Sequence, residues 1–272
     1  NFIDHADIYT LGKSEQVFGQ VLKDRPGLRQ QLLLQSKCGI RFPEEGGVPG
    51  RYDFSAHHLE TSVEGILSRL GVEHLEVLLL HRPDPLMEPE EVAAAFQRLR
   101  TAGKVRHFGV SNMSAGQMRL LRAALDMPLV VNQLEMSLEK VGFLETGVLV
   151  NQEGAAQRGF PEGTLEYCRL EHIQIQAWGP LAQGLYTGRS LEGQPESVQR
   201  TAALVAQLAE QKGTSREALV LAWLLKHPAH IQPVIGSTQP ERISACADAE
   251  RIQLTREEWY ALYVTSRGAR LP

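Results

Sequence analysis

The stretch EVLLLHRPDPLMEPEEVAAAFQRLRTAGKVRHFGVS, residues 76–111, decides the fold class. It opens with an apolar run that predicts a buried strand over residues 76–81, continues at helical spacing over residues 89–102, and closes with a β-rich run over residues 105–111. A strand, a helix and a second strand in this order form a βαβ unit, in which the two strands are parallel. The sequence therefore predicts an α/β protein with crossover helices.

The same alternation continues on both sides of this stretch. Further strands are predicted over residues 2–4, 31–37, 129–133, 173–178 and 231–236. Further helices are predicted over residues 14–23, 56–70, 115–125, 163–170, 197–211, 216–226, 240–248 and 255–266. Because seven strands are predicted and the chain opens inside a strand, we expect a (β/α)8 TIM barrel whose first β/α unit lies upstream of Asn1.

Nothing in the sequence divides the chain. There is no linker, low-complexity tract or strong internal repeat, so we predict one domain over residues 1–272, incomplete at its N-terminus. Residues 142–163 contain five glycines and are expected to form an inserted surface loop, and residues 41–50 a second long loop on the face where barrels keep their sites. Ser14, Ser114 and Thr214 are the expected helix N-caps.

Composition excludes several classes of protein. The chain has 28 Lys and Arg against 32 Asp and Glu, with no basic block, which argues against a nucleic-acid partner. Its apolar runs fall far short of the ~20 residues that span a bilayer, so no membrane association is expected. Cys38, Cys168 and Cys246 are far apart and in no paired motif, which indicates neither disulfides nor a zinc site and favours the cytoplasm.

Polar and aromatic residues end the predicted strands, where a barrel keeps its chemistry. In chain order these strand-end residues are Asp4 with Tyr9 shortly after it, Lys37, His81, Ser111-Asn112, Asn132-Gln133, Trp178-Gly179 and Gly236-Ser237-Thr238. Any one of them alone is more simply a turn cap, a buried ion-pair partner or a core residue. Together they have a chemical logic, because a phenol with an ordinary pKa of about 10 exchanges protons usefully near neutrality only beside a cation. Lys37 is the expected cation beside Tyr9.

The sequence resembles the aldo-keto reductases, and the resemblance covers nearly the whole chain. It is carried by the motifs FIDHADIY (2–9), LLLQSKCG (32–39), LLLHRPDP (78–85), KVRHFGVSN (104–112), VVNQLE (130–135), AWGPLAQG (177–184) and PVIGSTQPERI (233–243). The nearest subgroup is similar in its runs DHADIY, SKCGI and HRPDPLM, a set of bacterial oxidoreductases. The family's catalytic tetrad of Asp, Tyr, Lys and His maps in order onto Asp4, Tyr9, Lys37 and His81.

The resemblance implies an NADP(H)-dependent oxidoreductase that reduces an aldehyde or ketone to an alcohol. Tyr9 is then the general acid, Lys37 the neighbouring cation, Asp4 the partner of Lys37 and His81 the group that orients the carbonyl. The implied cofactor-binding residues are Asp4, Ser111, Asn112, Gln133, Trp178, Gly179, Leu181, Gln183, Gly184, Gly236, Ser237, Thr238, Gln239 and Arg242. A barrel-type cofactor site agrees with the absence of a G-x-G-x-x-G fingerprint after any predicted strand.

Roles within the cofactor site also follow from the resemblance. Ser111, Asn112 and Gln133 are expected to hold the carboxamide, Trp178 to stack on the nicotinamide where the family often has Tyr, and Arg242 to bind a 2′-phosphate. Gly236 stands where a basic residue is common, which predicts a weaker preference for the phosphorylated cofactor.

Two other functions stay open from the sequence. A cofactor-binding regulatory or interaction protein could use the same fold, as potassium-channel β subunits do. A barrel aldolase or isomerase would instead use Lys37 as a Schiff-base nucleophile.

Overall fold

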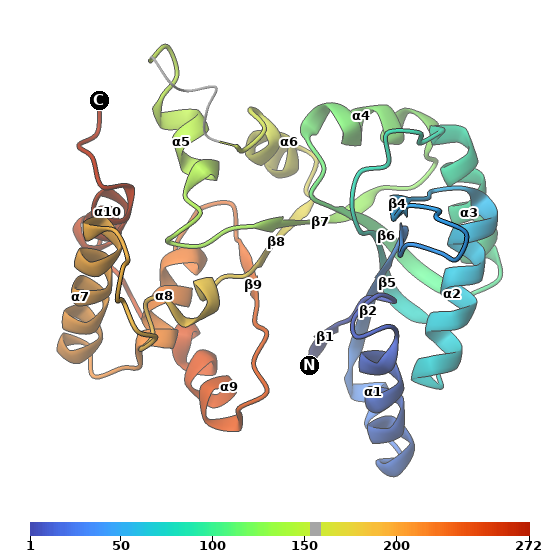
Figure 1. Cartoon of the computed structure of the whole chain (residues 1–272), viewed down its shortest axis with the longest axis horizontal. Coiled ribbons are helices and arrows are strands. Elements are labelled where there is room, and N and C mark those ends of the chain that lie inside the picture. Colours follow the sequence, from blue (N-terminus) through green and yellow to red (C-terminus); the bar gives the residue numbers. More distant parts are fainter. Residues whose placement is uncertain (153–158) are drawn as a thin grey trace. The chain divides into compact units, whose positions relative to one another are not determined.

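A computed structural model describes residues 1–152 and 159–272. It divides into two compact units, Asn1–Asn132 and Gln133–Pro272, and each is described by itself (Figure 1).

The first unit is built on four parallel strands. They are β1 (Phe2–Asp4), β2 (Leu33–Cys38), β5 (Leu75–Leu80) and β6 (Val105–Ser111), and they pair in that order. All six residues of β5 are buried, as expected of a strand that pairs with a neighbour on each side in a parallel sheet. The parallel register places the carboxyl ends of the four strands at one edge of the sheet.

The helices of the first unit lie along one side of these strands (Figure 1). They are α1 (Lys13–Asp24), α2 (Ala56–Leu70), α3 (Pro89–Thr101) and α4 (Ala115–Ala124). Phe96 of α3 stacks on Phe108 of β6 with ring centroids 4.0 Å apart, which ties helix to sheet. Between β2 and α2, the expected loop at residues 41–50 joins a small antiparallel pair, β3 (Ile40–Arg41) and β4 (Arg51–Tyr52).

The second unit continues the alternation after β7 (Leu129–Glu135), within which the two units meet in the sequence. Its strand order is β7, β8 (Gln174–Trp178) and β9 (Gln232–Val234), with β8 and β9 parallel. Its α-helices are α5 (Gly142–Val148), α6 (Thr164–Leu170), α7 (Glu196–Gln211), α8 (Arg216–Leu225), α9 (Pro240–Ala247) and α10 (Arg256–Arg267). Short 3-10 helices at Ala182–Gly184 and Asp248–Arg251 lie in the connections.

Three local predictions need correction. Residues 142–163 are not one loop, because α5 begins at Gly142 and buries Phe143 and Leu144; residues 153–158 of that segment lie outside the described part of the chain. Ser14 does not cap α1, which begins one residue earlier behind a left-handed Gly12. Ser215 rather than Thr214 caps α8, by accepting from the Ala218 N–H.

Other local predictions are confirmed. Ser114 forms a full capping box with Gln117 at the start of α4. No helix in the described ranges 1–152 and 159–272 combines the length and the apolar character that crossing a membrane requires.

Candidate active site

The four predicted catalytic residues come together at the carboxyl edge of the first unit. Asp4 is the last residue of β1, Lys37 is the penultimate residue of β2, and His81 directly follows β5. Tyr9 lies in the turn between β1 and α1. Parallel pairing is what brings these sequence-distant groups to one edge.

Lys37 and Asp4 form a buried ion pair. Nζ of Lys37 donates to Oδ2 of Asp4 at 2.7 Å and to the main-chain oxygen of His5 at 2.8 Å, and the Lys37 side chain is 1% exposed. The other carboxylate oxygen of Asp4 accepts from Nε2 of Gln35 at 2.6 Å. A buried charge requires such a partner, and this one also fixes the direction of the lysine side chain.

Tyr9 lies against this ion pair but reaches solvent. Nζ of Lys37 is 4.9 Å from the centroid of the Tyr9 ring, and the Tyr9 residue as a whole is 38% exposed. Thr10 and Leu11, which follow it, both have positive φ, a conformation that costs energy for residues other than glycine. The turn thus holds the phenol over a buried cation while leaving it open to a substrate.

His81 completes the group. Its ring meets the Tyr9 ring edge-on, with centroids 5.9 Å apart and planes at 80°. Burial, and then the positive charges of Lys37 and Arg82, lower the pKa of His81 to about 4, so the imidazole is neutral at physiological pH. A neutral imidazole can donate one hydrogen bond to a carbonyl oxygen without carrying charge.

Ser111 and Asn112 stand beside His81 at the end of β6. Asn112 adopts a left-handed conformation (φ 58°), which turns its side chain back toward the strand ends. Its Nδ2 donates to Oγ of Ser111 at 2.7 Å and to the main-chain oxygen of His81 at 3.4 Å. An amide and a hydroxyl therefore lie next to the predicted catalytic residue His81.

Sequence reasoning missed two acidic residues that interact electrostatically, the buried Glu15 and the half-buried Asp7. Glu15 is fully buried, pairs with Arg69 at 2.7 Å and accepts from the Ser36 hydroxyl at 2.6 Å. Burial, and then the nearby charge of Glu15, raise the pKa of Asp7 to about 7. Nothing in the motif DHADIY distinguishes Asp7 from an ordinary turn aspartate, because its environment is created by α1 and α2.

The remaining predicted residues belong to the second unit. Nε2 of Gln133, on β7, donates to Oε1 of Gln176 at 3.0 Å, and Trp178 ends β8. Trp178, Gly179 and Gln183 line a cavity of about 350 Å³. Leu181 and Gly184 bracket the short 3-10 helix beside it.

Two cations in this cavity were not predicted. Lys140 and Arg189 line it, and Nη1 of Arg189 donates to Oε1 of Gln183 at 3.4 Å. Lys140 and Arg189 fall outside every motif of the resemblance, so the sequence carried no signal for them. Glu135 and Glu139 also line the cavity, and Lys140 pairs with Glu139 at 3.4 Å.

The segment after β9 forms a separate polar surface. The Ser237 hydroxyl accepts from the Gln239 N–H at 3.2 Å and keeps its own hydrogen to donate, and Thr238 and Gln239 lead into α9. Arg242 is exposed on the first turns of α9. The nearby Asp248 pairs instead with Arg251, at 3.4 Å.

These residues fit a nicotinamide dinucleotide in their chemistry. A Cβ added at Gly179 or at Gly236 would meet no atom within 4 Å, so both positions leave open space for a ligand beside the backbone. The first unit contains the amide of Asn112 and the hydroxyl of Ser111. The second unit contains the aromatic ring of Trp178 and basic side chains such as Arg189.

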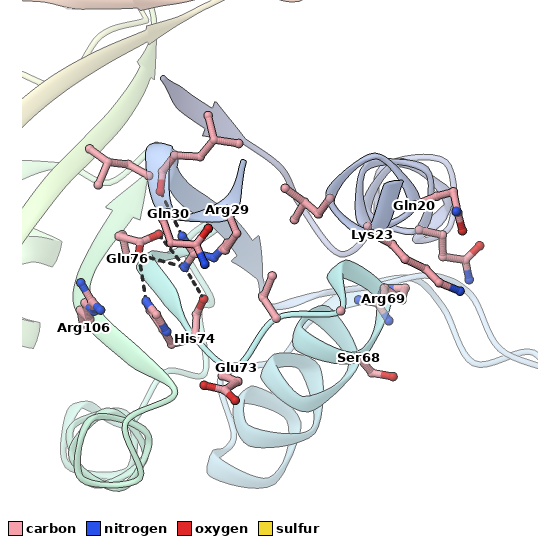
Figure 2. A pocket seen from close by; sticks show the side chains of 17 residues that line it. Gln20, Lys23, Arg29, Gln30, Ser68, Arg69, Glu73, His74, Glu76 and Arg106 are labelled. Carbon is pink, nitrogen blue, oxygen red and sulfur yellow. Dashed lines mark hydrogen bonds and ion pairs between the residues drawn. The ribbon is translucent and has the colours of Figure 1, made fainter. Parts of the chain in front are cut away.

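Another cavity of the first unit lies away from these residues. It measures about 1120 Å³ and lies at the amino ends of the strands, opposite the predicted catalytic residues (Figure 2). At its centre Glu76 accepts from Arg29 at 2.9 Å, from His74 at 3.0 Å and from the Leu34 N–H at 2.7 Å. With its carboxylate saturated by these donors, Glu76 ties the strand starts together and takes no part in the candidate active site.

Comparison with known proteins identifies the family. Residues 1–263 match the aldo/keto reductase family. The chain is 37% identical to the uncharacterized oxidoreductase YcsN of Bacillus subtilis, over 99% of this chain and 84% of that protein. It is 36% identical to the 6-dehydroglucose reductase of Agrobacterium fabrum, over 98% of this chain and 83% of that protein.

A solved structure supports the fold. The glycerol dehydrogenase of Gluconobacter oxydans aligns with a TM-score of 0.79 at 26% identity, over 97% of this chain and 80% of that chain. The fold class predicted from sequence, a (β/α)8 barrel, is thereby confirmed. The alternation of strands and helices, the family match and the likeness to solved structures together show that the chain belongs to the aldo/keto reductase family and is an oxidoreductase.

Proposed function

We propose that the protein reduces an aldehyde or ketone to an alcohol with NADP(H), using Tyr9 as the general acid. The observation that carries this proposal is the position of Tyr9: its partly exposed ring lies 4.9 Å from the fully buried ammonium of Lys37, which is itself paired with Asp4. When bound, the nicotinamide supplies the hydride that adds to the carbonyl carbon.

Each group of the tetrad has a separate task. Tyr9 donates its phenolic proton to the carbonyl oxygen as that oxygen gains negative charge. Lys37 stabilises the negative charge left on the phenol oxygen, and Asp4 holds Lys37 in place. The neutral His81 donates a hydrogen bond that orients the carbonyl.

The resemblance assigns the cofactor-binding residues, and the chemistry of their side chains supports that assignment. Ser111, Asn112 and Gln133 present amides and a hydroxyl for the carboxamide, and Trp178 presents a flat face for the ring. Gly179, Leu181, Gln183 and Gly184 would line the pyrophosphate path, together with Lys140 and Arg189. Gly236, Ser237, Thr238, Gln239 and Arg242 would hold the 2′-phosphate of NADP(H).

The test is NADPH oxidation with a panel of aldehydes and ketones. The panel includes 6-dehydroglucose, the compound named for the Agrobacterium fabrum relative. We expect turnover that Tyr9→Phe abolishes while NADPH binding is retained. The matched control is Tyr52→Phe, since Tyr52 is also a partly exposed tyrosine but stands on β4.

Each rival function predicts a different result. Tight NADPH binding without turnover of any carbonyl would favour the cofactor-binding regulator. Borohydride trapping of a carbonyl compound on Lys37 without nicotinamide would favour the aldolase. Full turnover by Tyr9→Phe would refute the assignment of Tyr9.

A further inference from the structure

A second ligand-sized cavity lies in the second unit. It measures about 540 Å³ and is enclosed by α5, α6, the end of α8 and α10. None of the predicted catalytic or cofactor-binding residues lines it. Its volume is within the range of about 300–1,000 Å³ that small organic ligands occupy in proteins.

The walls of this cavity are aromatic. The rings that line it are Phe143, His227, Trp259, Tyr260 and Tyr263. Five rings around one cavity offer flat, polarisable faces on which another aromatic ring can stack.

The aromatic wall is held rigidly. Trp259 stacks on the buried Trp223, with centroids 5.3 Å apart and planes at 13°. Each indole N–H donates to the other residue's main-chain oxygen, at 3.0 and 3.1 Å. Because both rings are fixed before any ligand arrives, little conformational entropy is lost on binding.

The rim of the cavity is cationic. Arg169, Lys226 and Arg256 line it and are exposed, and among the described residues Glu166 is the one acidic side chain that lines it. Within the described part of the chain, Arg169 and Lys226 have no ion-pair partner. Arg256 lies over the Tyr260 ring at 5.2 Å, which keeps its guanidinium beside the aromatic wall.

His227 adds a neutral polar group. Its Nδ1 accepts from the Ala229 N–H at 3.1 Å, which leaves the ring hydrogen on Nε2. Burial, and then the positive charge of Arg169, lower the pKa of His227 to about 4. The residue therefore offers a donor near neutrality and adds no charge.

We infer that this cavity binds a small aromatic carboxylate, whose ring stacks against Trp259 and Tyr260 while its carboxylate pairs with the cations of the rim. Aromatic walls alone would take neutral and charged rings alike. The excess of unpaired cations over acids makes the site selective for the anion.

Gly147 allows the site to be blocked selectively. It lies on α5, lines the cavity, and a Cβ added there would meet no atom within 4 Å. Gly147→Leu therefore has room for its Cβ, adds a larger apolar side chain at the cavity wall, and suits the helix better than glycine does. Gly147→Ala is the matched control that keeps the cavity open.

The probes are 4-(trifluoromethyl)benzoate and its neutral analogue 4-(trifluoromethyl)benzamide, titrated by fluorine NMR. We expect the benzoate to bind at least about tenfold more tightly than the benzamide. Gly147→Leu should abolish binding of both probes, and Gly147→Ala should retain it. The double variant Lys226→Gln/Arg256→Gln should weaken the benzoate by about tenfold or more and leave the benzamide unchanged.

Two results would overturn the inference. Unchanged benzoate binding in Gly147→Leu would show that the benzoate binds elsewhere, and equal affinity for the two probes would show that the rim does not select the anion. Carbonyl turnover and thermal unfolding of each variant should match the parent, since these residues lie outside the proposed catalytic group.

Discussion

The ammonium group of Lys37 lies 2.7 Å from Oδ2 of Asp4 and 4.9 Å from the centroid of the Tyr9 ring. The two charged side chains are 1% and 10% exposed, so each is the compensating charge of the other. The same ion pair therefore contributes to the stability of the fold and to the proposed chemistry. An experiment on Lys37 must measure these two effects separately.

Substituting Lys37→Met should lower turnover by about 100- to 10,000-fold, because proton donation by Tyr9 loses its neighbouring cation. It should also lower the free energy of unfolding by about 3–5 kcal/mol, because Asp4 becomes an unpaired buried charge. The double variant Asp4→Asn/Lys37→Met should regain most of the stability and none of the turnover. Urea unfolding and NADPH oxidation measure the two effects, and turnover restored in the double variant would contradict the role of Lys37.

His81 should stay neutral down to about pH 5. Its pKa in the folded protein is about 4 against an ordinary 6.5, so the unfolded chain takes up a proton first as the pH falls. The contribution of His81 to stability is therefore complete above pH 6.5 and is lost between about 6.5 and 4. Proton NMR identifies the His81 imidazole as the signal that disappears in His81→Gln. That signal should not titrate near pH 6.5, and a midpoint near 6.5 would refute the environment described.

Asp7 should destabilise the protein at alkaline pH. Its pKa rises from 3.8 to about 7 on folding, so the folded state retains a proton that the unfolded chain has lost. The free energy of unfolding should thus fall as the pH rises from about 4 to 7. Asp7→Asn should remove this dependence and stabilise the protein at pH 8 by roughly 1–3 kcal/mol.

The control for Asp7 is Asp126→Asn, which changes an exposed aspartate. Urea unfolding at pH 5 and at pH 8 compares the two variants with the parent. An equal pH dependence in the parent and in Asp7→Asn would show that Asp7 is ionised throughout.

Arg242→Ala should reduce the preference for NADPH over NADH by roughly 10- to 100-fold, the value of one charge-assisted hydrogen bond to a phosphate. Arg251→Ala is the matched control, since Arg251 is an exposed arginine in the next turn that pairs with Asp248. Dissociation constants for both cofactors give the ratio. A ratio that is unchanged in Arg242→Ala, or equal losses in the two variants, would refute the 2′-phosphate assignment.

The local sequence predicted helices and strands well where the apolar periodicity of a segment is unambiguous. The helix Ala56–Leu70 and the strand Val105–Ser111 have the bounds that periodicity predicted, because each has a clear apolar pattern and a clear end. The helix α5 was missed because glycines at positions 142 and 147 suggest a loop. Burial of Phe143, Leu144 and Glu145 outweighs that low helix propensity.

For the candidate site, the sequence alone determined the residue types and their places at the ends of strands. Parallel strands joined by helices carry their strand-end residues to one edge, so Asp4, Lys37 and His81 could be grouped without coordinates. Only the tertiary structure decided how these groups behave. The pKa of His81 and of Asp7 depend on burial and on charges far away in the chain, and the cavity between α5 and α10 depends on side chains more than a hundred residues apart. Periodicity reports which face of an element is apolar, whereas desolvation and Coulomb interactions depend on distances between elements, and those exist only once the chain has folded.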